Sequence, residues 1–161
     1  SGDLLYVTGY PGSAGFARIH NNVRLADCFS FPAPRVKFGQ ALRGLASAMI
    51  DISDGLDSDL RPLLRASKLG ANLDIADLPL AAEMVAELGQ AESAALALNG
   101  GEDYELCFCV PPEKAAEVEA LAGTSQVFIS CIGRVTTGME LQWLLNGETF
   151  FNPESGFRHF G

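Results

Sequence analysis

The chain has 161 residues, of which 48% are hydrophobic, and its formal net charge at pH 7 is -9. This length predicts one globular domain with a full core. The eleven Lys and Arg residues form no basic stripe, which argues against a nucleic-acid-binding protein. No apolar run approaches the roughly 18 residues of a membrane span, and the N-terminus has no secretory signal pattern. We therefore expect a cytoplasmic protein that binds neither nucleic acid nor membrane.

The elements of the first half are, in order, a strand over 4–8, a short helix over 16–19, a connection over 21–36, a helix over 36–48 and a strand over 48–52. The second half continues with a helix that begins at Leu56 and that Gly70 ends, a strand over 72–75, helices over 81–88 and 92–98, a strand over 104–110 and a helix over 113–121. Strand-like stretches over 126–135 and 139–145 predict a final hairpin. This order indicates an α+β fold, with a mixed sheet packed with helices.

The four cysteines, Cys28, Cys107, Cys109 and Cys131, form no C-x-x-C pair. Cys107 and Cys109 stand two apart on a predicted strand, so both side chains share one face of the sheet. We interpret all four as reduced, buried, structural thiols.

The run Ala48 to Leu56, AMIDISDGL, ends a predicted strand and begins an amphipathic helix. A helix N-terminus has unpaired backbone N–H groups and a positive dipole that can meet phosphate oxygens. Asp51 and Asp54 supply the hard oxygen ligands that magnesium prefers. The structural alternative is that Asp54 or Ser53 only caps the helix, while Asp57 and Asp59 complement its dipole. Asp51 favours a ligand, because a carboxylate that ends an apolar strand needs a cation or donors.

The run Asn99 to Leu106, NGGEDYEL, is the second candidate. Its glycine pair lets the backbone approach a ligand closely and places Glu102 and Asp103 at the start of a strand. The alternative is an ordinary solvated turn. The glycine-rich stretch 9–15 lacks the ending of a P-loop and is interpreted as a plain turn. His20 and His159 have no partner at metal-ligand spacing, so metal-dependent hydrolysis finds no support.

Several strings in order, MIDISDGL at 49–56, GGEDYELCF at 100–108, and PRV at 34–36 leading into GQAL at 39–42, resemble thiamine-monophosphate kinase. The resemblance covers residues 1–161, as a single C-terminal domain of that enzyme. It implies the fold shared with the C-terminal halves of aminoimidazole ribonucleotide synthetase and selenophosphate synthetase. It also implies transfer of the γ-phosphoryl group of ATP to thiamine monophosphate, giving thiamine diphosphate, with several Mg²⁺ ions between the two anions.

The resemblance also implies residue roles. Asp51 and Asp54 would be the catalytic magnesium ligands, and Ser53 would contact ATP. Glu102 would bind the substrate through its aminopyrimidine, with Asp103 beside it, and Phe157 would stack on the thiamine rings. The acceptor phosphate is already deprotonated, so positioning and charge neutralisation can carry the catalysis.

The family's N-terminal domain, which supplies further magnesium-binding aspartates and much of the ATP site, is not in this sequence. We therefore expect the chain alone to be weakly active or inactive. We expect it to be monomeric, and the full-length parent to be a homodimer. Two alternatives stay open: a domain of another ATP-dependent superfamily member, such as a synthetase or maturation factor, and a non-catalytic ligand-binding domain.

Overall fold

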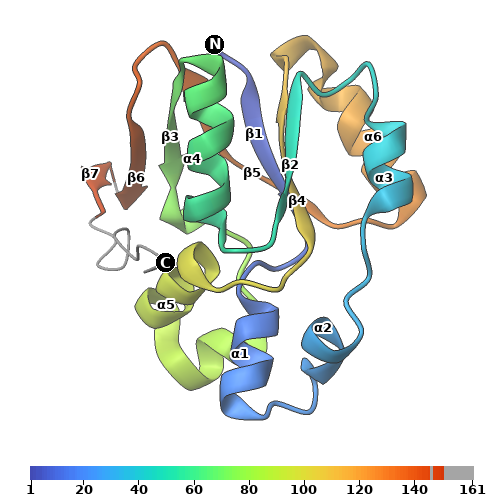
Figure 1. Ribbon diagram of the computed structural model, residues 1–161, viewed down its shortest axis with the longest axis vertical. Coiled ribbons are helices and arrows are strands. Elements are labelled where there is room, and N and C mark those ends of the chain that lie inside the picture. The colour runs from blue at the N-terminus through green and yellow to red at the C-terminus, as the bar shows by residue number, and fades with distance from the viewer. Residues whose placement is uncertain (146, 151–161) are drawn as a thin grey trace.

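The computed structural model describes residues 1–145 and 147–150 and contains one seven-stranded sheet in the order β2-β4-β1-β5-β3-β6-β7 (Figure 1). The strands are β1 (Leu4–Thr8), β2 (Ala48–Ile52), β3 (Gly70–Asp74), β4 (Glu105–Val110), β5 (Ile129–Thr136), β6 (Leu141–Leu145) and β7 (Glu148–Thr149). Neighbouring strands are antiparallel except β3 and β6, which are parallel. The mixed sheet expected from the sequence is confirmed.

The helices are α1 (Ser13–His20), α2 (Ala26–Ser30), α3 (Val36–Ala41), α4 (Leu56–Ser67), α5 (Ala82–Asn99) and α6 (Ala115–Ser125), with short 3-10 helices at Ile75–Asp77 and Pro112–Lys114. Two details differ from the sequence prediction. The connection before Val36 contains α2, and α3 ends at Ala41 rather than at residue 48. The two helices predicted over 81–98 are confirmed, because α5 is interrupted at Gly89, whose φ of 78° and ψ of 171° are not helical.

Helices cover both faces of the sheet, because side chains along each strand alternate between them. In β1, Leu5 and Val7 pack on one face in the core that contains the leucines of α4 and the C-terminal part of α5. Tyr6 points to the other face and packs with α3 and α6, which lie together at the right of Figure 1. Cys107 and Cys109 share the first of these cores, and all four cysteines are free thiols. Burial is confirmed for these two, whereas Cys28 and Cys131 are half-buried, so the prediction that all four are buried is wrong. Within the described part of the chain, no helix is long and apolar enough to cross a membrane.

The predicted hairpin of the last two long strands is wrong. β3 lies between β5 and β6, pairing antiparallel with the first and parallel with the second. The β5–β6 connection therefore crosses over the start of β3, where Gly70 has no side chain. A Cβ atom at Gly70 would lie 2.2 Å from the carbonyl oxygen of Glu140 and 2.5 Å from that of Gly138. The glycine that sequence analysis assigned to ending a helix thus makes the crossing possible.

We expect Gly70→Ala to destabilise the chain by about 2 kcal/mol, because the added methyl group meets backbone atoms that cannot rotate away. Urea unfolding measures this loss. Gly123→Ala in α6 is the matched control, since a Cβ there meets no atom within 4 Å and alanine favours a helix interior. Equal stability of the two variants would contradict the proposed crowding at Gly70.

Candidate functional site

The two motifs found in the sequence lie side by side at one end of β2 and β4. These strands are antiparallel neighbours, with Ile52 opposite Glu105, so the end of one meets the start of the other. The backbone N–H of Glu102 donates to the carbonyl oxygen of Ser53 at 2.8 Å, and that of Tyr104 donates to Ile52 at 2.8 Å. The structure therefore brings the Asp-Ile-Ser-Asp turn and the Gly-Gly-Glu-Asp loop into direct contact.

Two glycines allow this close approach. Gly55 adopts φ 111°, a conformation that L-residues rarely take, and a Cβ there would lie 2.8 Å from the carbonyl oxygen of Leu98. A Cβ at Gly101 would lie 2.6 Å from the carbonyl oxygen of Ser53. Gly55 and Gly101 are thus explained by close backbone packing, of Gly55 against the end of α5 and of Gly101 against Ser53.

The side chains of Asp51, Asp54 and Glu102 are exposed at this junction, and Ser53 is half-buried. The expectation that Asp51 needs a cation or donors because it ends an apolar strand is therefore wrong, since solvent can hydrate its carboxylate. The hydroxyl of Tyr104 donates to Oε2 of Glu102 at 3.0 Å. This bond and the charge of Glu102 raise the pKa of Tyr104, with smaller contributions from burial and from the charges of Asp51 and Asp54. The three carboxylates therefore create a shared negative field. Over residues 1–145 and 147–150, however, no three His, Cys, Asp or Glu side chains form a group that could hold a metal ion.

A cavity of about 360 Å³ lies beside Asp51, between α3 and the outer strand β2. Its walls are mostly apolar, with Val36 from α3, Met49 from β2 and Leu106 from β4. Asp51 and Tyr104 line the same cavity, so it opens directly onto the acidic junction. An apolar cavity that meets a few polar groups is the usual form of a small-molecule site.

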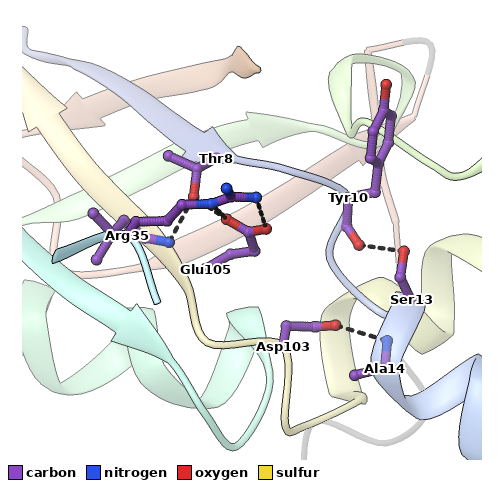
Figure 2. Close-up of polar contacts among 8 residues, drawn as sticks. Thr8, Tyr10, Ser13, Ala14, Arg35, Asp103 and Glu105 are labelled. Atoms are coloured by element: carbon purple, nitrogen blue, oxygen red, sulfur yellow. Dashed lines mark hydrogen bonds and ion pairs between the residues drawn. The ribbon is translucent and has the colours of Figure 1, made fainter. Parts of the chain in front are cut away.

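Asp103 has a different environment from the exposed Glu102 next to it. It is buried, and its Oδ2 accepts a hydrogen bond from the N–H of Gly12 at 2.6 Å, while Oδ1 accepts from Ala14 at 3.1 Å. Figure 2 shows its carboxylate directed at the first turn of α1. Burial raises the pKa of Asp103 to about 6, although the two N–H donors act in the opposite direction. In this structure Asp103 holds the glycine-rich loop and α1; its substrate-binding role stays a prediction.

The raised pKa of Asp103 predicts a pH-dependent stability. The folded state binds the proton more tightly than the unfolded state, whose carboxyl titrates near 3.8. Its contribution to stability is therefore complete below pH 4 and is lost as pH rises to 6, by about 2 to 3 kcal/mol. Urea unfolding of the native chain and of Asp103→Asn from pH 4 to 7 measures this, since asparagine does not titrate. Parallel stability curves would show that the carboxyl is not perturbed.

Arg35 and Glu105 form an ion pair to which sequence analysis assigned no role. Nε of Arg35 donates to Oε2 of Glu105 at 2.7 Å, and Nη2 donates to Oε1 at 2.6 Å. Figure 2 shows the two side chains face to face, with the hydroxyl of Thr8 also donating to Glu105. This pair fixes the segment before α3 to the start of β4, directly after Tyr104. Its sequence signal was present, because both residues lie in the strings that carry the family resemblance.

The first helical turns after Gly55 contain two further carboxylates with specific partners. Asp57 is buried and accepts two bonds from Arg61, at 2.8 and 3.0 Å, and one from the indole N–H of Trp143 at 2.6 Å. Asp59 accepts bonds from the backbone N–H groups of Ser53 and Asp54. The expectation that this end offers unpaired N–H groups to phosphate is therefore wrong for Ser53 and Asp54. Neither residue caps the helix through its side chain; Gly55 is the N-cap.

Phe157, predicted to stack on the substrate, and His159 lie outside the described residues.

Known proteins are similar to this chain in both sequence and fold. Residues 1–143 match the family model described as "AIR synthase related protein, C-terminal domain". The chain is 39% identical to the thiamine-monophosphate kinase of Escherichia coli strain K12 over 171 aligned residues, which cover 99% of this chain and 53% of that protein. The chain spans about half the length of the curated relatives it matches.

Two solved structures extend this likeness. The crystal structure of thiamine-monophosphate kinase from Stenotrophomonas maltophilia K279a aligns with a TM-score of 0.84 and 30% identity, covering 92% of this chain and 51% of that one. AaThiL complexed with AMPPCP and TMP aligns with a TM-score of 0.76 and 26% identity, covering 99% of this chain and 52% of that one. The matched region includes both motifs and almost the whole sheet. The chain therefore belongs to the family of C-terminal domains of AIR synthase related proteins.

Proposed function

We propose that this chain is the C-terminal part of a kinase that phosphorylates thiamine monophosphate with ATP to give thiamine diphosphate. The observation that carries the proposal is the direct contact of the two motifs, which brings Asp51, Asp54 and Glu102 to one junction beside a cavity. The likeness to thiamine-monophosphate kinases over 99% of this chain supports this assignment of substrate. A structural relative complexed with AMPPCP and TMP supports a nucleotide and TMP as ligands.

In the proposed reaction, Asp51 and Asp54 would hold Mg²⁺, which would bind the phosphates. Their exposure supports this role, because magnesium keeps several waters and binds through one or two carboxylates plus substrate phosphates. Two carboxylates from this chain leave the rest of the metal shell to phosphates, waters and the N-terminal part of the parent. Magnesium, when bound, would neutralise the negative charge that repels the two phosphate groups.

The other polar groups at the junction would bind and orient the reactants. Ser53 contacts ATP in our proposal, and Glu102 accepts a hydrogen bond from the aminopyrimidine of the substrate. Tyr104 already donates to Glu102, which orients its carboxylate. Phe157 stacks on the thiamine rings, and the aromatic face and the carboxylates suit a cationic thiazolium. Catalysis then rests on positioning the two phosphates, without a strong general base.

We propose that the parent is a cytoplasmic homodimer whose N-terminal domain completes the site. The test is Mg²⁺- and ATP-dependent conversion of thiamine monophosphate to thiamine diphosphate, measured on the full-length parent and on this chain alone. We expect product from the parent only. A folded parent that gives no thiamine diphosphate, yet phosphorylates or ligates another acceptor, would replace the substrate assignment with that of a different ATP-dependent member of the family.

A further inference from the structure

Asp59 links helix α4 to the turn that carries the predicted catalytic residues. Its Oδ2 atom accepts hydrogen bonds from the backbone N–H of Ser53 at 2.8 Å and of Asp54 at 2.9 Å. Both donors converge on this single oxygen. The side chain is half-buried, and it reaches back across Gly55 from within the first turns of the helix.

The turn at Ser53 and Asp54 is also restrained through a backbone carbonyl group. The carbonyl oxygen of Ser53 accepts the N–H of Glu102. Asp59 therefore restrains the donor side of the turn, while the Gly-Gly-Glu-Asp loop restrains its acceptor side. Gly55, with φ 111°, provides no side-chain cap that could do this instead. The direction in which the Asp51, Ser53 and Asp54 side chains leave the backbone depends on these restraints.

The negative charge of Asp59 is electrostatically unfavourable at this position unless hydrogen bonds offset it. Asp51 and Asp54 are near enough for their negative charges to act on it. A third carboxylate next to two others adds repulsion, which the two N–H bonds offset.

We propose that Asp59 is a positioning residue: by accepting the N–H groups of Ser53 and Asp54 on one oxygen, it holds the turn in the conformation that presents Asp51, Ser53 and Asp54 to metal-bound phosphate. This inference rests on the proposed function of the turn. It assigns to Asp59 no contact with metal or substrate. Groups that orient metal ligands commonly contribute about 10- to 100-fold to metal affinity or activity.

The single accepting oxygen makes the proposal testable against a direct role for the carboxylate. Asparagine keeps one carbonyl oxygen in the place of Oδ2 and can accept both bonds without charge, whereas alanine removes both. In the full-length parent, we expect Asp59→Asn to keep kcat and the half-saturating Mg²⁺ concentration within about threefold of the native enzyme. We expect Asp59→Ala to change both unfavourably, by about 10- to 100-fold. Ser58→Ala, an exposed neighbour on α4, is the control and should behave as the native enzyme.

Equal loss of activity in Asp59→Asn and Asp59→Ala would overturn the proposal, because it would show that the charged carboxylate itself acts at the site. Native behaviour of both variants would overturn it as well. If the alanine variant does not fold, Asp59→Glu takes its place, because its longer side chain keeps the charge but moves the accepting oxygen. We then expect Asp59→Glu to lose activity and Asp59→Asn to keep it, and native kinetics of Asp59→Glu would contradict the proposal.

Amide hydrogen exchange on this chain gives a readout that does not depend on the reaction. We expect slow exchange at Ser53 and Asp54 in the native chain and in Asp59→Asn, and fast exchange in Asp59→Ala, with the α4 core amides unchanged. Unchanged exchange at Ser53 and Asp54 in Asp59→Ala would contradict the proposed restraint. If the parent proves not to be a kinase, the proposed function fails, while this exchange pattern still tests what Asp59 does to the turn.

Discussion

Asp51→Asn in the full-length parent is expected to lower turnover by about 100-fold or more while leaving the fold intact. Among the described residues, Asp51 is the one carboxylate that lines both the acidic junction and the adjacent cavity. Asparagine has a similar shape but no charge, so it would weaken the binding of the Mg²⁺ that we propose neutralises the transferring phosphoryl group. The residue is exposed at the outer strand β2, so the loss of its charge leaves the core packing unchanged.

Steady-state kinetics over a range of Mg²⁺ concentrations, together with circular dichroism, measure this effect. Asp77→Asn is the matched control, because Asp77 is an exposed aspartate at the end of the 3-10 helix Ile75–Asp77. We expect that variant to retain native turnover. Native turnover of Asp51→Asn itself would remove Asp51 from the catalytic site and leave the acidic junction without its central metal ligand.

Asp57→Ala is expected to destabilise the chain by about 3 kcal/mol, which is the largest stability effect that we predict. The buried carboxylate is the shared acceptor for Arg61 on its own helix and for the indole N–H of Trp143 on β6. Alanine leaves the buried N–H of Trp143 without this acceptor and the Arg61 guanidinium without its counter-charge. Urea unfolding at neutral pH measures the loss.

A double-mutant cycle separates the network from simple loss of packing. Trp143→Phe removes the indole N–H, so in the Asp57→Ala background it should cost less than it does in the native chain. Ser58→Ala, at an exposed position of the same helix, should change stability by less than about 0.5 kcal/mol. Additive effects of Asp57→Ala and Trp143→Phe would show that the hydrogen bond between them contributes little.

Most elements could be predicted from the sequence because their signals are local. The strands over 4–8 and 48–52 have the predicted bounds, since each is a short run of β-prone residues between turn residues. Burial did not follow from the pattern alone, because β2 lies at the edge of the sheet and only its Ile52 is fully buried. The ends of α3 and α4 shifted because helix ends depend on the packing of the neighbouring turns. The final hairpin failed for a non-local reason: nothing in residues 126–145 shows that β3 occupies the place between the two strands.

The candidate site divides in the same way. Both motifs could be found from the sequence, because two carboxylates at the end of an apolar strand and a glycine pair before another strand are unusual local patterns. The tertiary structure showed that the motifs touch, and it separated the exposed Glu102 from the buried Asp103 beside it. It also revealed Asp59 as the partner of the Ser53 and Asp54 backbone.

The sequence by itself thus determined the fold class, the family and the two motifs, since each is written in neighbouring residues. Only the tertiary structure decided which polar groups are already occupied. Asp103 meets Gly12 across 91 positions, and Arg35 meets Glu105 across 70. A carboxylate has the same local sequence signal whether it faces solvent, a helix N-terminus or an arginine. Its role is settled by burial and by the partners that folding brings to it.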